Sequence, residues 1–200
     1  MSVVLETDRL VLRHMTRDDL EPLHAIMSER DVMRYIGDGS PLTIERVRHI
    51  IERAIIDETH AWEPELLQRL PQLELAPRRD AHFSLWATVY KPDNRLIGRC
   101  GLLAWDVDGK KEVEVGYLLD KPYWGKGLAT EVARASRDYG FTKLGVDRLI
   151  SVIQPGNVGS QRVAIKNGMH YERDWKVRDI PVRIYAIDRG AGASAPHAGV

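Results

Sequence analysis

The fold-determining stretch of this chain is Tyr123-Trp124-Gly125-Lys126-Gly127-Leu128-Ala129-Thr130-Glu131. Polar and apolar residues alternate before it, over 112–117, which is the pattern of a half-buried strand. Apolar residues recur at helical spacing after it, over 128–139. Glycines between a strand and a helix let the backbone approach an anion, and the first N–H groups of a helix have no internal partner. Together with the helix dipole, these donors predict a pyrophosphate-binding loop.

A second stretch with the same placement begins at residue 154, as Gln154-Pro155-Gly156-Asn157-Val158-Gly159-Ser160. It follows an apolar run at 148–153 that predicts a strand, and it opens another helix. Asn157 precedes this helix and Ser160 lies in its first turn, which are the positions of a helix cap. Two loops of this kind in this order are a more specific signal than either loop alone.

With both loops in view, the chain resembles the GNAT acyltransferases, and within them the ribosomal-protein N-terminal acetyltransferases. The loop of that branch often reads Tyr-Trp-Gly-Lys-Gly-x-Ala-Thr-Glu, as residues 123–131 do here. Its second motif is close to Asn-x-x-Ser-x-Arg-Val-x-x-Lys-x-Gly, which residues 157–168 match. Residues 5–13 are similar to its usual first strand. The resemblance covers about residues 3–188 and lapses over 60–80.

The resemblance implies one α+β domain over residues 1–189, with the GNAT fold. We expect six or seven mostly antiparallel strands and about four helices. The sheet is expected to splay beside the pyrophosphate loop, so that the gap admits the pantetheine arm of acetyl-CoA. Residues 60–80 form an insertion atypical of the family, and their apolar content indicates packing as a short helix, a lid or a dimer contact. Residues 190–200 lack periodicity and bulk, which predicts a disordered tail.

Local patterns predict the individual elements. Residues 3–12 indicate one kinked edge strand, and Thr16 and Thr43 each begin a helix. Further strands are expected over 83–90, 96–104, 112–119, 148–153, 169–177 and 182–188, with a turn at 105–110 between the second and third of these.

The predicted cofactor contacts are mostly backbone N–H groups of the first loop. With those that the resemblance implies, the set is Leu119, Trp124, Gly125, Lys126, Gly127, Leu128, Ala129, Thr130, Asn157, Ser160, Arg162 and Lys166. Each charged residue of this set has an alternative interpretation that involves no cofactor contact. Lys126 either reaches a phosphate or is only solvated, and Arg162 and Lys166 either meet the adenosine phosphates or face water.

The expected chemistry is attack of a neutral amine on the thioester carbon of acetyl-CoA. Deprotonation at pH 7 costs about 1 kcal/mol for an N-terminal α-amine and about 4.6 kcal/mol for a lysine, so an α-amine depends less on a strong base. Many members of the superfamily place a tyrosine acid seven residues after the motif asparagine. Ala164 occupies that position here.

Two residues are catalytic candidates. Glu114 lies on the strand that leads into the loop and is the best candidate for a base or a water-mediated proton acceptor; the alternative is a solvent-facing carboxylate. Ser160 is expected to lie along the pantetheine and thioester, and the alternative is the first turn of a capped helix.

Composition excludes several classes. The 29 basic and 29 acidic residues cancel, so no global charge favours nucleic acid or anionic lipid. Cys100 is the one cysteine, and a packed core thiol is a better interpretation than a nucleophile. No His-x-x-x-His or Cys-x-x-Cys spacing indicates a metal. No segment approaches 18 apolar residues, and we expect a cytoplasmic protein that does not cross a membrane.

The expected function is acetyl transfer from acetyl-CoA to a primary amine, above all a protein or peptide N-terminal α-amine. The alternatives are a small amine, such as an antibiotic, polyamine or amino acid, or a non-catalytic acyl-CoA-binding module, which the absence of a tyrosine at 164 allows. Acidic residues at 106, 108, 112 and 114, near the expected cleft, favour a cationic acceptor. Monomer and homodimer both remain open.

Overall fold

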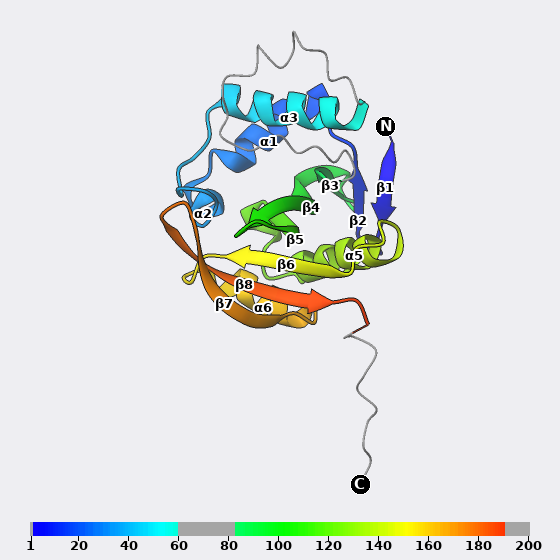
Figure 1. Ribbon diagram of the computed structural model, residues 1–200. Helices are drawn as coiled ribbons and strands as arrows, with labels where there is room; N and C mark the ends of the chain where they lie inside the picture. The colour runs from blue at the N-terminus through cyan, green and yellow to red at the C-terminus, as the bar shows by residue number, and fades with distance from the viewer. Residues whose placement is uncertain (1, 60–82, 191–200) are drawn as a thin grey trace.

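The computed structural model describes residues 2–59 and 83–190, which form an α+β structure on one sheet (Figure 1). Eight strands are paired in the order β1-β2-β3-β4-β5-β6-β8-β7. Their bounds are β1 Val3–Glu6, β2 Leu10–Arg13, β3 Leu85–Tyr90, β4 Arg95–Val107, β5 Lys110–Leu119, β6 Arg148–Ile153, β7 His170–Val177 and β8 Ile180–Asp188. All neighbouring pairs within this sheet are antiparallel except β5 and β6. The predicted fold class is confirmed, with eight strands in place of six or seven. The 60–80 insertion and residues 191–200 lie outside the described residues.

Helices cover both faces of the sheet. The described part of the chain holds α1 Leu20–Met27, α2 Arg30–Met33, α3 Ile44–Thr59, α5 Leu128–Thr142 and α6 Val158–Lys166, with 3₁₀ turns η1 Arg17–Asp19 and η2 Lys121–Tyr123. Ala87 and Leu118 pack with α1 and α3, whereas their chain neighbours Trp86 and Leu119 pack with α5. Because successive side chains of a strand point to opposite faces, the central strands are buried on both sides.

The expected helix starts are confirmed. Thr16 and Asp19 form a capping box at η1, and the Asp19 carboxylate accepts from the Thr16 N–H at 2.8 Å. The hydroxyl of Thr43 accepts from the N–H of Arg46 at 3.4 Å, next to the start of α3.

Two expectations about strands are wrong. Residues 3–13 form the β1–β2 hairpin and not one kinked strand, because Thr7 N–H donates to the Leu10 carbonyl at 2.9 Å and closes a turn. β4 continues through 105–107, because Val107 is buried in a small apolar cluster with Trp105 against it. The β4–β5 turn is therefore only Asp108-Gly109, whose φ angles of +54° and +80° match a two-residue hairpin.

The sheet parts between β5 and β6. These strands share one registered pair, Glu114 and Ile150. Beyond this pair, side chains form hydrogen bonds with backbone groups that continued strand pairing would have satisfied. Glu114 Oε1 accepts from Val152 N–H at 3.2 Å, and the Ser151 hydroxyl donates to the Val115 carbonyl at 3.0 Å. This is the splay that the resemblance implied.

Candidate active site

A cleft of about 720 Å³ lies where the sheet parts. The end of β5, the loop before α5 and the start of α6 line one part of it, and α2 with the segment after it lines another. Every residue of the predicted cofactor set except Lys126 lines this cleft, which brings together two loops that are separate in the sequence.

The loop before α5 has the geometry of an anion site. Gly125 and Gly127 have φ angles of +73° and +79°, and Gly127 is the residue before the helix. The first intrahelical bond runs from Glu131 N–H to the Gly127 carbonyl at 3.0 Å. The N–H groups of residues 128–130 therefore have no partner inside the helix, and these residues line the cleft. A Cβ on Gly125 would meet nothing within 4 Å, so backbone conformation, not crowding, selects glycine there.

The side chains of Trp124 and Lys126 make contacts within the protein. Lys126 Nζ lies 5.1 Å from the centroid of the Tyr123 ring, a cation–π arrangement. Trp124 Nε1 donates to the Leu119 carbonyl at 2.7 Å, and the residue is 46% exposed beside the cleft. The loop is thus held at Leu119, the last residue of β5.

At the start of α6, the expected helix cap is present. Asn157 Oδ1 accepts from Ser160 N–H at 3.1 Å, and both residues line the cleft. Arg162 and Lys166, one turn apart on α6, are exposed and line it as well.

Tyr117 is the residue that sequence reasoning missed. Its hydroxyl donates to the Ser160 carbonyl at 3.3 Å, so it joins β5 to α6 across the cleft that both residues line. Burial raises the pKa of Tyr117 well above its ordinary value of 10.0, so the phenol keeps its proton at neutral pH. The strand alternation places Tyr117 on the same face as Val113 and Val115, a pattern that indicates core.

Glu114 does not line the cleft and is not the solvent-facing carboxylate of the alternative interpretation, because it is only 9% exposed. Its Oε2 accepts from Trp105 Nε1 at 2.5 Å and its Oε1 from Val152 N–H at 3.2 Å. Both oxygens are engaged, and they connect β4, β5 and β6 where the sheet begins to part.

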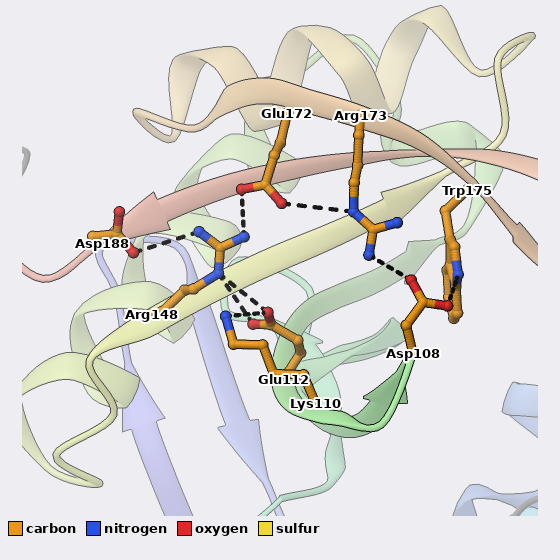
Figure 2. Close-up of polar contacts among 8 residues, drawn as sticks. All are labelled: Asp108, Lys110, Glu112, Arg148, Glu172, Arg173, Trp175 and Asp188. Atoms are coloured by element: carbon orange, nitrogen blue, oxygen red, sulfur yellow. Dashed lines mark hydrogen bonds and ion pairs between the residues drawn. The ribbon is translucent and has the colours of Figure 1, made fainter.

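The expectation of an acidic cluster beside the cleft is wrong, because none of its four carboxylates lines the cleft. Asp106, Asp108 and Glu112 are instead paired with cations, and Figure 2 shows the pairs of Asp108 and Glu112. Glu112 accepts from Arg148 Nε at 3.2 Å and pairs with Lys110 at 2.9 Å. Arg148 also pairs with Glu172 and Asp188. Asp108 accepts from Arg173 at 2.9 Å and Trp175 at 3.0 Å, and Asp106 faces Lys111. This network connects β5, β6, β7 and β8.

Another wall of the cleft comes from α2 and the residues after it. Tyr35 lies so close to Gly156 that a Cβ there would come within 3.0 Å of its ring. Gln154 Nε2 donates to the Gly37 carbonyl at 3.1 Å. Asp31, on the same wall, is ion-paired with Lys121. The contacts of Tyr35 and Gly37 fasten this wall to the loop before α6, and the ion pair fastens it to η2.

Cys100 is 1% exposed, and burial raises the pKa of its thiol to about 12. It is a packed core thiol, as expected. In the described residues, no group of three or more His, Cys, Asp or Glu side chains is arranged to hold a metal. None of the helices in this part of the chain has the length and apolarity that a membrane crossing requires.

A splayed α+β sheet with a glycine-rich helix start at its opening is the architecture of the GNAT acyltransferases. Residues 9–170 match the acetyltransferase (GNAT) domain family. The chain belongs to this family of acyl-CoA-dependent transferases. It is 29% identical over 172 residues to the uncharacterized N-acetyltransferase YoaA of Bacillus subtilis, covering 86% of this chain and 85% of the relative. It is 36% identical over 102 residues to the uncharacterized protein YkkB of the same organism, covering 51% of this chain and 59% of the relative.

Solved structures share the fold. A GNAT-family acetyltransferase from Bacillus anthracis is 26% identical, with a TM-score of 0.68 over 92% of this chain and 97% of that chain. The ribosomal alpha-N-protein acetyltransferase RimL in complex with coenzyme A is 16% identical, with a TM-score of 0.69 over 95% and 99%. The aminoglycoside acetyltransferase AAC(6')-Ib in complex with coenzyme A is also 16% identical, with a TM-score of 0.67 over 92% and 97%. At 16% identity the likeness shows the shared fold alone.

Proposed function

We propose that this N-acetyltransferase transfers the acetyl group of acetyl-CoA to the N-terminal α-amine of a protein or peptide. The charge of the cleft is the observation that supports this acceptor. In the described lining, Asp31 is the one carboxylate, and it is already paired with Lys121. The cations of the lining are Arg34, Arg162 and Lys166. An acceptor with several ammonium groups would find no unpaired carboxylate in this lining, whereas a peptide that offers one α-amine does not depend on one.

For the donor, we propose that the N–H groups of residues 128–130 bind the diphosphate of acetyl-CoA. The cationic side chains of Arg162 and Lys166, which line the same cleft, would meet the remaining phosphate, on the ribose. Leu119, Asn157 and Ser160 line the part of the cleft between the parted strands, where the pantetheine arm would lie. The exposed residue Trp124 lies in the loop before α5.

In the proposed reaction, the amine nitrogen attacks the thioester carbon, and the C–S bond breaks as the tetrahedral intermediate collapses. The amine proton passes to water, and the thiolate takes a proton from solvent. For an α-amine, about 1 kcal/mol of deprotonation cost at pH 7 makes a strong base unnecessary. The engaged oxygens of Glu114 favour a structural role over direct proton abstraction.

We assign Tyr117 as a hydrogen-bond donor to the departing thiolate. Its hydroxyl lies beside Ser160, the residue that the resemblance places along the thioester. Burial keeps the phenol protonated, and its single O–H would turn from the Ser160 carbonyl to the sulfur when negative charge develops there. Strand β5 would thus supply the hydrogen-bond donor that Ala164, on α6, does not.

The test is thiol release from acetyl-CoA with matched acceptors. These are a lysine-free peptide with a free N-terminus, the same peptide with a blocked N-terminus, an aminoglycoside and a polyamine. We expect release with the free peptide only, and that peptide should gain the mass of one acetyl group. Release with the aminoglycoside or the polyamine, but with neither peptide, would show that the acceptor is a small amine and not a peptide. Coenzyme A binding without release on any acceptor in a broad panel would favour a non-catalytic module.

A further inference from the structure

The turn between β1 and β2 contacts the first turn of α5. Glu131, on α5, accepts from the Thr7 hydroxyl at 2.5 Å, from Arg9 N–H at 3.0 Å and from Arg9 Nε at 2.7 Å. Arg9 Nη2 completes a forked pair with Glu131 Oε2 at 2.6 Å. The carboxylate thus gathers donors from a turn more than a hundred residues away in the chain.

Arg9 also reaches the cofactor loop itself. Its Nη1 donates to the carbonyl of Lys126 at 3.0 Å, between the two glycines of positive φ. A trans peptide is planar, so its C=O and N–H point in opposite directions. A Lys126 carbonyl held toward Arg9 therefore turns the N–H of Gly127 the other way. Gly127 lines the cleft, whereas neither Arg9 nor Glu131 does.

We propose that Arg9 and Glu131 are positioning residues for the diphosphate loop, which rests on the proposed use of acetyl-CoA. They hold the Lys126–Gly127 peptide with its carbonyl away from the ligand and its N–H toward it. A glycine-rich loop populates many backbone conformations, and several of these would turn a carbonyl toward the diphosphate. The planar guanidinium binds the carboxylate and the carbonyl at once, which a lysine ammonium on a flexible stem cannot do in the same geometry.

The competing explanation is that these contacts only fasten the N-terminal hairpin. Arg9 is 41% exposed, so its ion pair contributes little to global stability. The two explanations therefore differ in what the variants change. A fastening role predicts a change in stability alone, and a positioning role predicts a change in affinity for the diphosphate.

The experiment compares Arg9→Lys and Glu131→Gln with the unaltered protein. Arg9→Lys keeps the positive charge near the loop, so weaker binding isolates geometry from long-range attraction. We expect each variant to raise the Kd of coenzyme A and the KM of acetyl-CoA about 10-fold, with kcat at saturation within about twofold. The double variant should be little worse than either single one, because both changes break the same unit. With acetyl-pantetheine, which has no diphosphate, kcat/KM should be unchanged.

Arg189→Lys is the matched control. Arg189 donates from Nε and Nη2 to the Val146 carbonyl, away from the cleft, and its replacement should leave coenzyme A binding as it was. Unaltered coenzyme A affinity in Arg9→Lys, or an equal loss with acetyl-pantetheine, would overturn the positioning role. Failure of the unaltered protein to bind coenzyme A would instead reject the proposed function. The two failures are thus distinct.

Discussion

Glu114 accepts a hydrogen bond from the backbone N–H of Val152, 3.2 Å away, at the point where β5 and β6 stop pairing. The Glu114 carboxylate takes the place of a backbone carbonyl of a paired strand. The N–H of Val152 therefore keeps an acceptor although the two strands separate. Because its second oxygen is bound to Trp105, this side chain contacts both sides of the opening.

Glu114→Gln should lower the free energy of unfolding by about 1–3 kcal/mol, because an amide NH₂ would face one of two donors without accepting from it. Turnover per folded molecule should fall less than 10-fold. Urea unfolding and steady-state kinetics on the same preparation measure both quantities. A loss of turnover of about 100-fold with unchanged stability would instead place Glu114 in proton transfer.

Tyr117→Phe removes the hydroxyl beside Ser160 and keeps the ring. We expect kcat to fall about 10-fold while the Kd of coenzyme A stays the same, because the lost donor acts on charge that develops during the reaction. Tyr185→Phe is the control, since that buried hydroxyl bonds Gln161 and does not line the cleft. Equal kcat in the two variants would remove Tyr117 from the chemistry.

Gly127→Ala forces an L side chain to φ +79°, which costs about 1 kcal/mol. The strain falls on the peptide whose N–H is proposed to bind the diphosphate, so coenzyme A binding should weaken several-fold. Gly109→Ala, at φ +80° in the β4–β5 turn, carries the same strain away from the cleft. Calorimetric titration of both variants should show weaker binding in Gly127→Ala only. Parallel losses would show that general destabilisation is the cause.

Arg148→Met should destabilise the protein by about 2 kcal/mol, because it leaves the buried carboxylate of Glu112 with Lys110 as its remaining cation in the network of Figure 2. Glu172→Gln removes a more exposed member and should cost less than about 1 kcal/mol. Urea unfolding gives both values. Equal costs would mean that the burial of Glu112 does not matter.

The Glu131 contacts predict a pH dependence. Burial raises the pKa of Glu131, but hydrogen bonds from Thr7 and Arg9 outweigh it, so the folded pKa lies below the ordinary value of 4.5. A lowered folded pKa adds stability above the unfolded pKa, and this stability is lost as pH falls through the folded pKa. The stability difference between the unaltered protein and Glu131→Gln should thus be constant near neutral pH and shrink below about pH 4.5. A difference that grows toward acid pH would reverse this sign.

The local order of the chain determined much of this structure. The glycines at 125 and 127, the alternation before them and the helical spacing after them predicted the loop and its flanking elements, because each depends on neighbours within a few residues. The second loop and the helix caps at Thr16 and Thr43 could be predicted from the sequence for the same reason. Of the predicted cofactor set, all but Lys126 line the cleft.

Tertiary structure alone decided the partners of the charged and polar side chains. A strand pattern assigns Glu112 and Glu114 to one face but does not reveal that Arg148 and Val152, on β6, pair with them. Nor does it show that Tyr117 reaches Ser160, or that Arg9 reaches Lys126. Periodicity reports which face a residue occupies, whereas a hydrogen bond requires two groups within about 3 Å. Only the packing of distant segments brings them that close.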